Sequence, residues 1–131
     1  MAQWEDVSTQ YLLSASCTGS NWGCGLSCAD FNSDGLDDLT VAQASGNVSL
    51  YLRTEDGFDL DQELESDDQA TGVLWVDVDG DGDLDLFAGR QENGVKLYIR
   101  NGSGELVDES SARGVPDWIE WKPRGISAAD F

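Results

Sequence analysis

The sequence contains no histidine and only 7 lysines and arginines, against 26 aspartates and glutamates, for a formal charge of −19. Without histidine the chain lacks the commonest general acid-base catalyst and the usual imidazole ligand of zinc. A surface this negative repels phosphate backbones, so we expect no nucleic acid among its partners. The sequence also lacks an apolar run long enough to cross a bilayer, which argues against membrane insertion.

Proline is scarce as well, with 2 residues, whereas 40% of the chain is hydrophobic and 5 residues are tryptophan. An acidic disordered tail has the opposite balance, because it contains too few large apolar side chains to form a core. The length suits one domain of modest size. The composition therefore predicts a folded chain of the kind that collects hard cations on its carboxylates.

The cysteines are few, and they cluster: Cys17, Cys24 and Cys28 lie in one glycine-rich stretch. Their spacing is not a paired CxxC motif and no second cluster follows, so we do not expect structural zinc. One local disulfide with a leftover thiol would imply an oxidising compartment, and three reduced cysteines are the alternative. Residues 1–10 are polar and unlike a signal peptide, so the signal of an exported protein would lie outside this chain.

An internal repeat organises the chain. The segment GLSCADFNSDGLDDLTVA from Gly25 resembles GVLWVDVDGDGDLDLFAG from Gly72, and GISAADF from Gly125 matches the opening of both. A period of about 50 residues is typical of repeat architectures. We expect four parts: an outer strand and connection over 1–24, complete repeats over 25–71 and 72–124, and a truncated third repeat over 125–131.

Each repeat is expected to fold into short strands. Apolar or alternating runs rich in β-branched and aromatic residues cover 39–42, 48–52, 84–88 and 95–99. Turn signals separate these runs, and no helical periodicity of useful length is present. Four short strands in a unit of about 40 to 50 residues are typical of a propeller blade. The predicted fold class is all-β, with blades of four antiparallel strands that form about two and a half repeats of an incomplete β-propeller.

Each complete repeat contains an acidic loop with oxygen-bearing residues at alternate positions. Alternate residues of a tightly curled loop point inward, and Gly35 or Gly82 permits the sharp bend at position 6. A cage of five or more flexible oxygens suits Ca²⁺ better than Mg²⁺. We expect two calcium sites, with ligands from Asp30, Asn32, Asp34, the Leu36 carbonyl and Asp38 in the first loop, and from Asp77, Asp79, Asp81, the Asp83 carbonyl and Asp85 in the second.

An EF-hand and a solvated acidic turn are the alternatives for these loops. An EF-hand requires a bidentate glutamate at position 12, where this chain has Val41 and Ala88. The flanking segments are also strand-like, so position 9 must supply the closing ligand. Two copies in register, each with the turn glycine, argue against a turn that binds nothing.

The motifs DFNSDGLDDL and DVDGDGDLDL, each followed by a strand and a VxLYxR strand, resemble FG-GAP/VCBS-type repeats. That family occurs in integrin α-subunit propellers, cartilage acidic protein and bacterial surface proteins. The resemblance implies a seven-bladed β-propeller with calcium in the loop between the first two strands of a blade. It also implies that the remaining blades of the same propeller are partners of this segment. Asn32 departs from the pattern, and the third loop contains only Asp130.

No catalytic constellation accompanies the acidic loops. Histidine-based pairs are impossible, the lysines are limited to Lys96 and Lys122, and a carboxylate that ligates calcium is not available for acid-base work. We therefore expect no enzyme activity from this segment. The leading hypothesis is an extracellular or cell-surface propeller segment with structural calcium, used for adhesion or for recognition of a protein or glycan ligand. The alternative is an accessory propeller scaffold of a larger secreted enzyme.

Three tryptophans form a candidate ligand face. Trp22, Trp118 and Trp121 lie in long connections which, in the resembling propellers, sit opposite the calcium loops where ligands dock. Exposed indoles beside Lys122 could hold a sugar ring or a partner protein. The alternative is that they pack between blades, as large aromatic residues are usually mostly buried.

Overall fold

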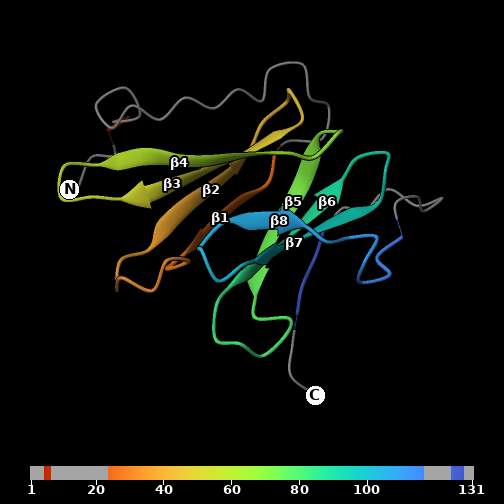
Figure 1. The fold of residues 1–131 in the computed structure, drawn as a ribbon. Helices are drawn as coiled ribbons and strands as arrows, with labels where there is room; N and C mark the ends of the chain where they lie inside the picture. The colour runs from red at the N-terminus through yellow and green to blue at the C-terminus, as the bar shows by residue number, and fades with distance from the viewer. Residues whose placement is uncertain (1–4, 7–23, 117–124, 129–131) are drawn as a thin grey trace.

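The computed structural model describes residues 5–6, 24–116 and 125–128, which contain eight strands and no helix. Two four-stranded antiparallel sheets lie side by side, each with its strands in chain order (Figure 1). The prediction of an all-β fold is confirmed, and the two sheets are compatible with propeller blades, although the described residues form no closed ring. The first sheet comprises β1 (Leu26–Ala29), β2 (Asp38–Ala42), β3 (Asn47–Arg53) and β4 (Phe58–Glu65), and the second comprises β5 (Ala70–Val76), β6 (Asp85–Arg90), β7 (Val95–Arg100) and β8 (Leu106–Asp108).

Glycine turns set the register of the central hairpins. Between β2 and β3 the Gln43 N–H donates to the Asn47 carbonyl at 2.8 Å, and Gly46 adopts a φ of 95° that disfavours other residues. Between β6 and β7 the Arg90 N–H donates to the Gly94 carbonyl at 2.7 Å, and Gly94 has a φ of 77°. The same turn chemistry thus recurs in the two repeats.

The two sheets share one hydrophobic core, which includes Trp75 of β5. Its ring stacks on Phe31 with centroids 4.7 Å apart, and its Nε1 donates to Thr40 Oγ1 at 2.8 Å. The Arg100 guanidinium lies 5.4 Å from the Phe31 ring centroid, within cation–π range. Aromatic pairs of this kind contribute about 0.5–1.5 kcal/mol beyond the area they bury. Trp75 is therefore a core residue.

The outer strands of the two sheets are joined by a side-chain amide. Gln62 Nε2 of β4 donates to the Leu106 carbonyl of β8 at 3.3 Å, and Gln62 Oε1 accepts from the Leu106 N–H at 3.4 Å. The Gln62 side-chain amide therefore bonds to Leu106 of β8 as the backbone of a neighbouring strand would. The rest of β4 exposes carboxylates such as Asp59 and Asp61, and charged side chains on an edge strand discourage pairing with other chains.

Several predicted segments differ from the structure or lie outside its described part. The run predicted over 84–88 begins one residue later, because β6 starts at Asp85 and continues to Arg90. The second sheet begins at Ala70, shortly before the repeat predicted to start at residue 72, and the domain boundaries stay predictions. Residues 125–128 belong to neither sheet, and Trp22, Trp118 and Trp121 lie outside the described residues. In the described part of the chain, no helix is long and apolar enough to span a membrane.

Candidate metal centre

The two acidic loops lie at the same end of their sheets. One joins β1 to β2 and the other joins β5 to β6, and both are on the lower side of the view in Figure 1. The antiparallel strand order places the β2–β3 and β6–β7 turns and the β4–β5 connection at the opposite end. Each loop thus has the placement that the resemblance implied, between the first two strands of a sheet.

The second loop brings three carboxylates together. Asp77, Asp79 and Asp85 each contribute one carboxylate oxygen, and these oxygens lie within 4.8 Å of one another. They correspond to positions 1, 3 and 9 of the predicted cage. A set of carboxylate oxygens on a loop with further acidic residues fits a hard divalent cation such as Ca²⁺. Among the described residues this loop is the one that gathers such a group.

Backbone amides hold the carboxylates of the second loop in place. Asp77 Oδ1 accepts from the Gly80 N–H at 2.7 Å, and its Oδ2 accepts from the Gly82 N–H at 3.1 Å. Asp81 Oδ1 accepts from the Asp83 N–H at 2.9 Å. The φ angles of Gly80 and Gly82 are 77° and 97°, values that L side chains rarely adopt. The loop curls because its amides turn toward its own carboxylates, which partly offsets their mutual repulsion.

The position-9 aspartates are the buried members of the loops. Asp85 is 1% exposed, and its oxygens accept from the Val78 N–H and the Arg100 N–H, both at 2.9 Å. Asp38, which is 0% exposed, does the same in the first loop: its oxygens accept from the Phe31 N–H at 3.2 Å and the Arg53 N–H at 2.8 Å. Each aspartate therefore ties the start of its loop to the end of the third strand.

Burial affects the protonation of the first of these residues. It raises the pKa of Asp38, although the hydrogen bonds from the Arg53 and Phe31 backbone oppose the shift. The structural role of Asp38 and Asp85 was not predicted from the sequence. Their recurrence at position 9 of both repeats is the signal that could have revealed it.

The first loop has a more closed pattern of internal hydrogen bonds. Asp30 accepts from the Asp34 and Gly35 amides at 3.0 and 2.9 Å, and Asp34 accepts from the Leu36 amide at 2.8 Å. Asn32 Nδ2 donates to Asp34 Oδ2 at 2.9 Å. Among the described residues, the first loop does not gather three carboxylate oxygens as the second loop does, and its predicted ligand set stays a prediction.

An arginine that the sequence did not single out reaches the second loop. Arg113 Nη2 lies 2.9 Å from Asp79 Oδ2, and Arg113 Nε lies 2.9 Å from Glu109 Oε2. Arg113 lies 34 positions beyond Asp79 along the chain, so no local pattern connects them. The sequence feature that could have drawn attention to Arg113 is that it is a basic residue within an acidic stretch.

The sequence matches the family model of FG-GAP-like repeats over residues 30–88 and again over 77–131. The chain belongs to the FG-GAP-like repeat family. The two matches overlap across the second acidic loop. The structure of this FG-GAP pair shows the repeat as two four-stranded sheets with the same strand order. FG-GAP repeats of this kind are consistent with a segment of an integrin-like β-propeller. No curated protein matches this FG-GAP chain.

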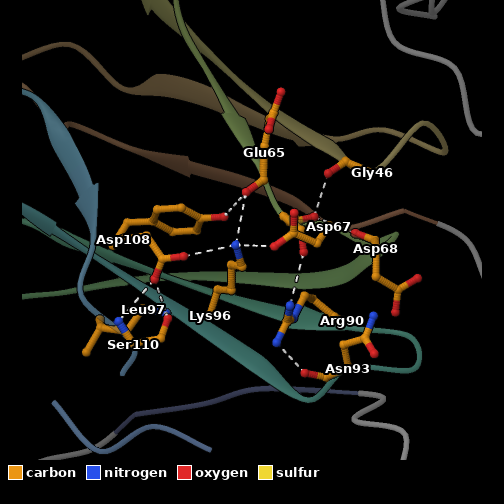
Figure 2. Close-up of polar contacts among 12 residues, drawn as sticks. Gly46, Glu65, Asp67, Asp68, Arg90, Asn93, Lys96, Leu97, Asp108 and Ser110 are labelled. Carbon is orange, nitrogen blue, oxygen red and sulfur yellow. Dashed lines mark hydrogen bonds and ion pairs between the residues drawn. The ribbon is translucent and has the colours of Figure 1, made fainter. Parts of the chain in front are cut away.

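The end of the FG-GAP pair opposite the acidic loops contains a second polar cluster, shown in Figure 2. Lys96 Nζ lies 2.6 Å from Asp67 Oδ2, 2.9 Å from Asp108 Oδ2 and 3.4 Å from the Glu65 carbonyl. Arg90 Nη1 donates to the Ser66 carbonyl at 3.2 Å nearby. The cluster borders a polar hollow of about 560 Å³. Buried Lys96 neutralises part of the charge of Asp67 and Asp108, so the cluster does not resemble a metal site.

The cysteines divide as the interpretation of one disulfide with a leftover thiol predicts. Cys24 is disulfide-bonded, and Cys28 is an exposed free thiol. Cys17 lies outside the described residues.

Proposed function

We propose that this FG-GAP pair is a calcium-binding segment of an extracellular β-propeller, with calcium as a structural ion. The observation that carries the proposal is the convergence of the Asp77, Asp79 and Asp85 oxygens within 4.8 Å, in the loop between the first two strands of an FG-GAP repeat. Calcium bound there would supply the positive charge that links these carboxylates. Asp81 and the carbonyl of Asp83 are the further ligands that we propose.

The protein's own contribution is to hold the ligands before any ion arrives. Asp85 is fixed by two backbone amides, and Asp77 is fixed by two glycine amides. Ordering these side chains in advance reduces the entropy lost on binding. We propose that the first loop, with Asp30, Asn32, Asp34, the Leu36 carbonyl and Asp38, binds calcium more weakly, because Asn32 lowers its charge.

We further propose that the segment is extracellular and serves binding rather than catalysis. The disulfide of Cys24 supports an oxidising, extracellular setting, since such bonds rarely persist in the cytosol. Lys96 forms ion pairs with Asp67 and Asp108, and we propose a binding role rather than catalysis for this segment. We propose that the assembled propeller, with the remaining blades as partners of this segment, serves adhesion or the recognition of a protein or glycan.

Titration calorimetry with calcium tests the metal site. The wild-type chain should bind calcium in the second loop, and the double variant Asp77→Ala with Asp81→Ala should lose that binding event. The matched control is Asp59→Ala with Asp61→Ala, which removes the same charge from exposed positions on β4. The control should retain calcium binding. Unchanged calcium affinity in the loop variant would refute the assignment.

A further inference from the structure

A cation of the chain contacts one of the carboxylates of the proposed calcium cage. Arg113 Nη2 lies 2.9 Å from Asp79 Oδ2, and Asp79 is one of the three carboxylates that converge in the second loop. The side chain of Asp79 is 26% exposed and that of Arg113 is 35% exposed, so the pair lies at the surface, where a calcium ion could reach Asp79. A guanidinium and a calcium ion would thus compete for the charge of the same carboxylate.

The arginine is held in this position by a hydrogen-bonded turn. The Glu109 N–H donates to the Leu97 carbonyl of β7 at 3.0 Å, which anchors the start of the turn to the second sheet. The Arg113 N–H donates to the Glu109 carbonyl at 2.9 Å, and Gly114 closes the turn with a φ of 72°. Glu109 Oε2 also accepts from Arg113 Nε at 2.9 Å. The turn and the Glu109 contact therefore place the guanidinium within reach of Asp79.

The two acidic loops differ in charge, and the Arg113–Asp79 contact lies at the position where they differ. The second loop has an aspartate at position 3, where the first loop has Asn32. The segment 61–68, which ends the first sheet and follows it, contains no basic residue, whereas the second sheet is followed by Arg113. Arg113 therefore offsets the additional carboxylate that distinguishes the second loop from the first.

We propose that Arg113 is a built-in competitor of calcium, which neutralises Asp79 in the ion-free loop and withdraws when calcium binds. The inference rests on the calcium site proposed above and adds its regulation. Because binding linkage is reciprocal, calcium in the loop also releases the 109–114 turn from Asp79. The affinity of the second loop for calcium is set below the value that its four carboxylates alone would give.

The decisive variant is Arg113→Gln, measured by calcium titration calorimetry. The parent carries Asp30→Asn and Asp34→Asn, so that the heat reports on the second loop. Removing one positive charge beside a divalent ion should tighten calcium binding about three- to tenfold at about 0.15 M salt, given Coulomb interaction at short range and partial screening. Arg113→Lys is the matched control: it retains the charge and should remain within about twofold of the parent. Equal or weaker binding by Arg113→Gln would overturn the proposal.

The side-chain N–H signals of Arg113 in NMR spectra give a second readout. They should shift when calcium saturates the parent, and Asp79→Ala should move them in the same direction without calcium. Signals that do not move on calcium addition would contradict withdrawal of Arg113. If the parent shows no calcium binding that Asp77→Ala abolishes, the proposed calcium site fails together with this inference. If that binding is present but Arg113→Gln does not tighten it, the competition alone fails.

Discussion

At the scale of single residues, Asp38 and Asp85 are more than candidate ligands. Each is buried, and each accepts two backbone N–H groups that join the start of its loop to the end of a distant strand. A buried carboxylate in this position satisfies donors that would otherwise have no partner. The aspartate proposed to close each metal site therefore also stabilises the fold through its hydrogen bonds to the backbone.

The first prediction concerns Asp85→Ala in the absence of calcium. The substitution leaves the Val78 and Arg100 amides without their acceptor, so it should lower the free energy of unfolding by about 2–4 kcal/mol. Urea denaturation with a chelator present measures this effect. Asp81→Ala is the comparison, since Asp81 is exposed and, among the described residues, accepts from the Asp83 N–H, so its loss should change stability by less than about 1 kcal/mol. Equal losses in the two variants would contradict the structural role of Asp85.

At the scale of elements, the two sheets are joined by polar as well as apolar contacts. Lys96 of β7 contacts Asp67 and Glu65 at the end of the first sheet, and Tyr98 Oη donates to the same Glu65 carbonyl at 2.8 Å. Asp108 of β8 contacts Lys96 from the other side, as Figure 2 shows. One buried ammonium thus connects the second sheet to the β4–β5 connection.

The second prediction concerns Lys96→Met. It should lower the free energy of unfolding by about 1–2 kcal/mol at neutral pH, less than for a fully buried pair because the partner side chains are 64% and 41% exposed. Burial alone would raise the pKa of Asp108, yet hydrogen bonds from Ser110 and Lys96 lower it below the ordinary value. A carboxyl whose folded pKa is lowered stabilises the fold above its unfolded pKa and loses that contribution as the pH falls.

Urea denaturation at neutral pH and at a pH below the ordinary carboxyl range measures this dependence. The difference in stability between wild type and Lys96→Met should shrink on acidification, because protonated Asp108 no longer attracts Lys96. A difference that does not change with pH would contradict the role given to this ion pair.

The parts of the fold that the sequence predicted are those governed by local pattern. Apolar or alternating runs predicted β3 and β7, turn signals predicted the breaks between the strands, and the spacing of the aspartates predicted which loops are candidate metal sites. The contacts that were missed join residues far apart in the chain, such as Asp85 with the Arg100 amide and Asp79 with Arg113. Periodicity carries no information about such contacts, because they depend on how strands pack in three dimensions.

At the scale of the whole molecule, the formal charge of −19 is unevenly placed. The acidic loops lie at one end of both sheets (Figure 1). The buried cations Arg90 and Lys96 flank the β6–β7 turn, which the strand order places at the other end. Repulsion among the loop carboxylates opposes the compact state, and the backbone amides and Arg113 offset part of it. Two divalent ions would cancel about four further charges at the end where the repulsion is greatest.

The central claim is that the second acidic loop of this FG-GAP pair is a calcium site. A crystal structure of the chain grown with calcium tests it most directly, with anomalous scattering to identify the ion. The account predicts a calcium peak among the oxygens of Asp77, Asp79, Asp81 and Asp85 and the carbonyl of Asp83, with Arg113 withdrawn from Asp79. A well-ordered loop with no such peak at saturating calcium, and with Arg113 still on Asp79, would contradict it.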